Sequence, residues 1–154
     1  MKSPIFAALA LTAASSLFAQ TAPVIPDLGT ATATGGNWSW VQTADGSEAT
    51  FTDAYSRPQL IIHCTRLNRR VLIAKPAMAA APFLGIWTSS QSRNLPASFN
   101  PATGRLTADL PAFDPLLDAV ATSRGRIGAV VAGSAPVVVP PWAEIARVVE
   151  DCRV

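Results

Sequence analysis

The chain has 154 residues, of which 49% are hydrophobic, and a formal net charge of +2. This length and composition are sufficient for one domain with a hydrophobic core and give no sign of a second domain. A charge so close to neutral argues against a nucleic acid or an anionic membrane surface as the partner, because both attract strongly basic proteins.

Residues 1–19 have the pattern of a secretory signal peptide. Lys2 supplies the positive start, residues 5–11 form a short apolar run, and small residues lead to a cleavage site that we expect after Ala19. The apolar run is short for a membrane-spanning helix, and no second run of about 20 apolar residues follows it. We therefore expect a mature chain without a membrane span, which is periplasmic or secreted.

The mature chain is expected to contain a leader and one folded domain. Residues 20–36 are rich in Thr, Ala, Pro and Gly and have no periodic apolar pattern, which predicts a flexible leader. The single β-rich domain is then expected to span residues 37–154.

Turn signals divide this domain into short strands. Asp45-Gly46 favours a hairpin turn, and the four residues 66–69 between two β-patterned runs predict a second antiparallel hairpin. Residues 76–82, which are alanine-rich and bounded by prolines, fit either a loop or one helical turn. Strands are expected at residues 37–41, 48–52, 58–65, 70–75, 83–88, 95–99, 105–110, 127–132 and 136–139.

Two helices are predicted late in the chain. Asp114 is placed as an N-cap with Pro115 at the first helical position, and this helix should end near Ser123, before Gly125. The second helix follows Pro140-Pro141. On a helical wheel its apolar arc contains four side chains, namely Trp142, Ile145, Val149 and Cys152.

The order of elements predicts a mainly β fold with a minor α content. Such a chain fits an antiparallel β-sandwich or a half-open barrel, with the C-terminal helix packed on the sheet. Strand alternation turns Cys64 to the same side as Leu60 and Ile62, and the helical arc turns Cys152 inward. Because an exported protein meets an oxidising environment, we predict a disulfide between Cys64 and Cys152.

The sequence offers little for catalysis or metal binding. His63 is the only histidine, and a metal site would need it together with carboxylates such as Asp45 or Asp53, for which no ligand spacing exists. His63 cannot readily activate Cys64, because adjacent strand residues point to opposite faces. There is no nucleophile elbow, phosphate-binding loop or Cys-Xaa-Xaa-Cys pair. We therefore predict no catalytic residue, no metal site and no cofactor.

Arginines and tryptophans are the remaining candidates for binding. Arg66, Arg69 and Arg70 gather at one predicted hairpin and form a hypothetical partner-binding cluster, although a solvated loop would have the same composition. Most of the four tryptophans should lie in the core, and Trp40 or Trp87, at strand ends, is expected to be exposed.

The C-terminal residues carry a resemblance to known proteins. The segments 123–126, 141–144 and 147–153, with a strand ending in Gly133 between them, resemble the carboxyl end of small, exported, uncharacterised proteins of alphaproteobacteria. The wider layout resembles periplasmic type VI secretion-associated proteins of the VasI/TagO kind. In those proteins a Leu-Xaa-Ile-Xaa-Cys strand precedes a hairpin, and a strand, a helix and a final cysteine come later. The matching residues here are Leu60, Ile62, Cys64 and Cys152.

The resemblance implies a disulfide-bonded periplasmic β-domain without known catalysis. One departure is Asp45-Gly46-Ser47, where the VasI/TagO-like proteins have Asp-Asp-Ser. The function we expect is a non-enzymatic, periplasmic or secreted binding or accessory domain of the cell envelope, with an envelope protein or polymer as its partner. The alternative is an enzyme acting on envelope polymers, or an enzyme inhibitor. A pocket that holds His63 with a carboxylate would favour the enzyme, and a flat arginine or tryptophan patch would favour binding.

Overall fold

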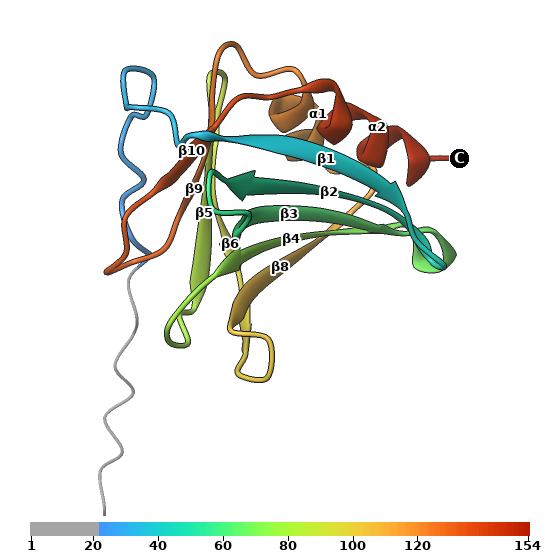
Figure 1. The fold of residues 1–154 in the computed structure, drawn as a ribbon, viewed down its shortest axis with the longest axis horizontal. Helices are drawn as coiled ribbons and strands as arrows, with labels where there is room; N and C mark the ends of the chain where they lie inside the picture. Colours follow the sequence, from blue (N-terminus) through green and yellow to red (C-terminus); the bar gives the residue numbers. More distant parts are fainter. Residues whose placement is uncertain (1–21) are drawn as a thin grey trace, which may run out of the picture.

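The computed structural model describes residues 22–154, so the predicted signal peptide, residues 1–19, lies outside the described residues. The described chain forms two antiparallel sheets and two α-helices, one of them at the C-terminus (Figure 1). The predicted mainly β fold, an antiparallel sandwich with a C-terminal helix packed on it, is confirmed. None of the described helices is long and apolar enough to cross a membrane.

The larger sheet has six strands in the order β1-β2-β3-β4-β8-β7, and the smaller has four in the order β10-β9-β5-β6. The strands of the larger sheet are β1 Gly36–Gln42, β2 Gly46–Asp53, β3 Pro58–Thr65, β4 Arg70–Pro76, β8 Arg105–Pro111 and β7 Ser98–Asn100. Those of the smaller sheet are β10 Val137–Val139, β9 Ile127–Val130, β5 Phe83–Thr88 and β6 Ser92–Pro96. The helices are α1 Pro115–Ala121 and α2 Ala143–Asp151, with a 3-10 turn η1 Arg66–Asn68 between β3 and β4.

The larger of two hydrophobic clusters lies between the sheets and the two helices. Alternate residues of each strand of the larger sheet face inward, as Phe51 and Leu60 do on β2 and β3. The ring of Phe51 meets the ring of Trp38 edge to face, with 5.5 Å between the ring centroids. Helix α2 packs across β1, β2 and β3 beside α1, and buries Ile145 against this core (Figure 1).

The strand predicted at residues 95–99 is wrong, because two strands of different sheets share that segment. Leu95 pairs with Leu84 in the smaller sheet, whereas Phe99 pairs with Leu106 in the larger one. The chain crosses between the sheets at Ala97, whose N–H donates to the carbonyl of Pro82 at 3.0 Å. The side chains of β6 and β7 face the same core. The apolar alternation in the sequence therefore continues through the point at which the chain changes sheet.

The first helix begins as predicted but ends earlier. The carboxylate of Asp114 accepts a hydrogen bond from the N–H of Leu116 at 2.8 Å, which is the expected N-cap. The helix ends at Ala121, and Thr122 caps it by donating its N–H and its hydroxyl to the carbonyl of Asp118, at 2.9 Å and 2.7 Å. The hydroxyl of Ser123 donates to the carbonyl of Arg126 at 2.6 Å, and Gly125, with φ of 78°, turns the chain there.

The segment of residues 22–35 corrects the prediction of a flexible leader over residues 20–36. This segment runs beside β10, β9 and β5 (Figure 1), and its Leu28 is only 4% exposed, packed against Val130 and Val138. The N–H of Thr34 donates to the carbonyl of Val138 at 2.6 Å. The segment therefore covers the outer face of the smaller sheet, which the helices leave open.

Candidate functional site

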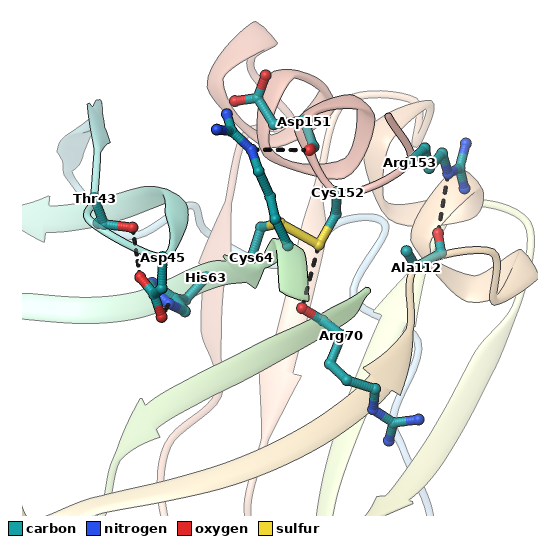
Figure 2. Close-up of a disulfide and its surroundings, with 10 residues drawn as sticks. Thr43, Asp45, His63, Cys64, Arg70, Ala112, Asp151, Cys152 and Arg153 are labelled. Atoms are coloured by element: carbon teal, nitrogen blue, oxygen red, sulfur yellow. Dashed lines mark hydrogen bonds and ion pairs between the residues drawn. A yellow bond between two sulfur atoms is a disulfide. The ribbon is translucent and has the colours of Figure 1, made fainter. Parts of the chain in front are cut away.

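The predicted disulfide between Cys64 and Cys152 is present. It joins the end of β3 to the residue that caps α2, and the two Cα atoms are 5.5 Å apart. Both cysteines are fully buried, and the sulfur of Cys152 lies 3.2 Å from the carbonyl oxygen of Arg70 (Figure 2). The bond therefore lies directly beneath the hairpin that carries the predicted partner-binding arginines.

The structure brings Arg66, Arg69 and Arg70 to one hairpin but turns them to different neighbours. Arg66 Nε donates to the carbonyl of Asp151 at the end of α2, at 3.4 Å. Arg70 is half-buried and forms an ion pair with Asp109 on β8, with 2.8 Å between Nη2 and Oδ2. Arg69 is exposed and has φ of 51°, in the left-handed region, where it closes η1.

Leu67 marks the tip of this hairpin. It lies between Arg66 and Arg69 and is 97% exposed. Its apolar side chain faces solvent and is therefore available for contact with a protein partner. We call residues 66–70 the arginine hairpin; its exposed surface combines an apolar side chain with the guanidinium groups of Arg66 and Arg69.

His63 lies on the outer face of the larger sheet, opposite Cys64, as predicted. Its Nε2 is 3.0 Å from Oδ2 of Asp45, and its Nδ1 is 3.3 Å from Oε2 of Glu48. The hydroxyl of Thr43 and the His63 ring both bind Asp45 and lower the pKa of that carboxyl group (Figure 2). Each ring nitrogen therefore contacts a different carboxylate, so the three groups do not converge on one point where a metal ion would bind. No metal-binding group of three or more such residues occurs in residues 22–154.

The tryptophans differ from expectation. Trp142, predicted in the buried arc of the last helix, is instead its N-cap residue and is 42% exposed. The helical wheel does not apply to it, because its backbone is still extended as the chain leaves the two prolines. Trp40 is half-buried beneath the guanidinium group of Arg147, whose central carbon is 3.3 Å from the ring centroid. Trp87 is half-buried against the N-terminal segment.

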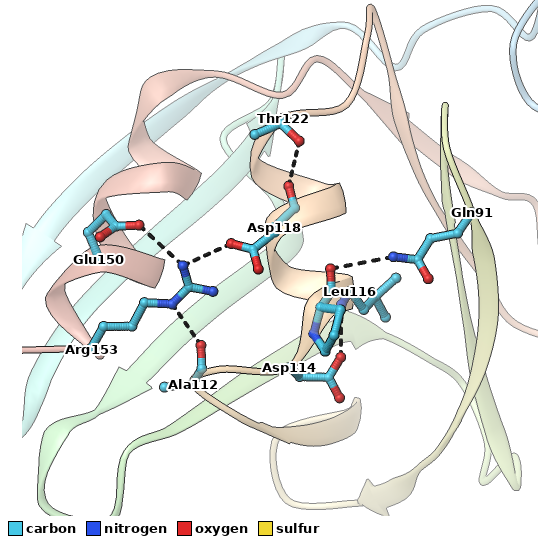
Figure 3. Close-up of polar contacts among 9 residues, drawn as sticks. Gln91, Ala112, Asp114, Leu116, Asp118, Thr122, Glu150 and Arg153 are labelled. Atoms are coloured by element: carbon cyan, nitrogen blue, oxygen red, sulfur yellow. Dashed lines mark hydrogen bonds and ion pairs between the residues drawn. The ribbon is translucent and has the colours of Figure 1, made fainter.

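Arg153, near the C-terminus, has a structural role. Its Nε donates to the carbonyl of Ala112 at 3.0 Å, and its Nη1 forms ion pairs with Asp118 at 2.8 Å and Glu150 at 3.4 Å (Figure 3). Several interactions raise the pKa of the Arg153 guanidinium group, and the hydrogen bond to Asp118 has the largest effect. Arg153 therefore ties α2 to α1 and to the turn before α1.

Lys75 is a feature that sequence reasoning missed. It is only 5% exposed, and its Nζ donates to the hydroxyl of Ser134 at 3.3 Å. Among the described residues it takes part in no ion pair, and burial lowers the pKa of its amine. A signal was available, because strand alternation puts Lys75 on the same face as Val71 and Ile73.

Replacing Lys75 with methionine is expected to raise the free energy of unfolding at neutral pH. Between the lowered pKa of the folded state and the ordinary value of 10.5, the unfolded chain binds one proton more than the folded chain does. The stability of the wild type therefore rises with pH in that window, whereas methionine does not titrate. Urea unfolding at pH 7 and pH 10 should show the advantage of Lys75→Met shrinking at the higher pH. A constant difference would contradict the buried, uncompensated amine.

No family model, curated protein or solved structure matches this chain. The resemblance to VasI/TagO-like proteins stays a prediction based on Leu60, Ile62, Cys64 and Cys152.

Proposed function

We propose that this protein is an exported binding domain of the cell envelope that contacts a partner protein through the arginine hairpin. The observation that carries the proposal is Leu67, 97% exposed between two exposed arginines at the tip of a braced loop. The exposed leucine is available for an apolar contact, and the disulfide beneath the loop holds it in place for binding.

The arginine hairpin is held in place from several sides. The N–H of Arg66 donates to the carbonyl of Asp45 at 2.9 Å, and the carbonyl of Arg69 accepts from the N–H of Ala112 at 2.9 Å. The Cys64–Cys152 disulfide fixes the strand that leads into it. A loop that is already ordered loses less conformational entropy on binding, so its contacts contribute more fully to affinity.

The chemistry of the hairpin suggests the character of its partner. Arg66 and Arg69 suit planar, bidentate contacts with carboxylates, and Leu67 suits a small apolar recess. We therefore expect an acidic protein surface with a hydrophobic depression. Arg70 is already paired with Asp109 and orients the base of the hairpin.

A sequence prediction and a structural feature support an extracytoplasmic location. The predicted signal peptide directs export, and the disulfide between two buried cysteines fits an oxidising compartment such as the periplasm or the exterior. The location and the partner are parts of the same proposal, because an envelope partner requires an exported chain.

Replacing Arg66, Arg69 and Arg70 with serine is expected to abolish most partner binding while leaving the melting temperature nearly unchanged. Exposed ion pairs contribute about 0–1 kcal/mol, so the loss of the Arg70–Asp109 pair should be small. The measurement is capture of partner proteins from periplasmic extract by the immobilised chain, compared with thermal unfolding of each variant. Leu67→Ser should weaken the same capture without any change in charge.

The matched control replaces three arginines elsewhere, namely Arg57, Arg105 and Arg124, with serine. It changes the net charge equally, so retained binding in this variant would exclude a general charge effect. Full retention of the partner by the hairpin variant, or the loss of its fold, would show that the hairpin is scaffold.

A further inference from the structure

Lys75 and Ser134 meet at the end of β4 that lies away from the arginine hairpin. Lys75 is the last inward-facing residue of that strand, and Ser134 lies on the turn between β9 and β10. Gly133, with φ of 76°, shapes the turn and brings Ser134 Oγ to 3.3 Å from the amine. Ser134 is exposed whereas Lys75 is buried, so an accessible hydroxyl has a buried amine directly behind it.

Two hollows meet at Ser134. One, of about 170 Å³, lies between residues 77–81 and residues 131–134. The other, of about 380 Å³, is lined by residues 76–78, Gly104 and Ser134. Apart from Ser134, both are lined by alanine, glycine, proline, valine and methionine. A molecule bound at Ser134 therefore finds small apolar recesses next to the hydroxyl.

The surroundings of Lys75 favour an uncharged amine. A buried ammonium group needs a carboxylate partner, and within residues 22–154 none of the ion pairs involves Lys75. A neutral amine has a free electron pair and can accept a proton, which makes a neighbouring serine hydroxyl a stronger nucleophile. Serine–lysine pairs are a known variant of the serine nucleophile with a base.

We propose that Ser134 is a nucleophile for acyl transfer, with Lys75 as its general base, and that it accepts short apolar acyl groups from esters. The Ser134 hydroxyl now donates to the carbonyl of Val131 at 3.2 Å and must rotate toward the amine to react. Oγ then attacks the ester carbonyl carbon while its proton passes to Nζ of Lys75.

The remaining steps restore the site. The bond from the carbonyl carbon to the alcohol oxygen breaks, and that oxygen takes the proton from Nζ, which leaves an acyl ester on Ser134. Water then attacks this ester, gives a proton to Nζ, and releases the carboxylic acid as Ser134 Oγ takes that proton back. No oxidant, reductant or metal is needed. The activity goes beyond the proposed binding function and uses none of the residues of the arginine hairpin.

The test treats the disulfide-intact mature chain with p-nitrophenyl butyrate and, separately, with an alkyl fluorophosphonate. We expect release of p-nitrophenol, and peptide mapping by mass spectrometry should place the phosphonate on Ser134. Ser134→Ala should abolish both, and Ser98→Ala, at an exposed strand serine, should change neither. Lys75→Met should slow both reactions by about 10²–10⁴-fold, the usual contribution of a general base.

Three results would overturn the proposal. They are no labelling of the wild type by either reagent, labelling spread over several hydroxyl groups or on Lys75, and an unchanged rate in Lys75→Met. Circular dichroism of each variant separates loss of reaction from loss of fold. Partner capture by Ser134→Ala tests the arginine hairpin independently, so either proposal can fail alone.

Discussion

Replacing both Cys64 and Cys152 with alanine is expected to lower the free energy of unfolding by about 4–5 kcal/mol. The two cysteines are 88 residues apart, and closing a loop of this length removes much of the conformational entropy of the unfolded chain. Domains are typically stable by about 5–15 kcal/mol, so this loss is a large share of the total stability. Urea unfolding of the oxidised wild type and the variant measures the difference.

Reduction of the wild type provides the control for this expectation. Dithiothreitol should destabilise the wild type by a similar amount and leave the double variant unaffected, because only the wild type contains the bond. A loss below about 1 kcal/mol would contradict the chain-entropy argument. Finding two alkylatable thiols in the native, unreduced protein would contradict the disulfide itself.

Replacing Leu28 with alanine is expected to destabilise the fold by about 2–4 kcal/mol, in the range of buried leucine truncations. Leu28 covers β9 so closely that a Cβ on Gly128 would overlap Cδ1 of Leu28. Gly128→Ala alone should therefore also be destabilising, by about 1–3 kcal/mol. The methyl group fits once Leu28 is shortened, so the double variant should lose less than the two single variants together.

Urea unfolding of these variants tests whether the N-terminal segment belongs to the folded domain. Val24, in the same segment, is 92% exposed, and Val24→Ala should change the free energy of unfolding by less than about 0.5 kcal/mol. If Leu28→Ala were as neutral as Val24→Ala, the segment would contribute no stability and would act as a leader after all.

The two proposed sites lie at opposite ends of β4. Arg70 begins the strand at the arginine hairpin, and Lys75 lies near its other end. Five residues along a strand correspond to about 17 Å, too far for one small ligand to occupy both sites. The strand is central in the larger sheet, paired with β3 and β8, so both sites rest on a rigid element.

Local patterns in the sequence determined most of the strands, the start of α1 and the pairing of Cys64 with Cys152. These features depend on a few neighbouring residues: alternation in β3, an aspartate before a proline at α1, and the inward face of α2. The arginine hairpin could be located for the same reason, since β3 and β4 flank a short loop. The sequence also places Leu67 in this loop, but only the structure shows that its side chain is fully exposed.

Only the tertiary structure decided how distant segments meet. Local periodicity shows that a residue has an apolar face but not which surface will cover it, so the packing of Leu28 against Val138 could not be predicted. The sequence pattern does not reveal that the chain crosses between the sheets at Ala97, because the strands on both sides of Ala97 face the same core. Lys75 and Ser134 are 59 residues apart, and their contact exists only because β4 and the β9–β10 turn come together in the folded chain.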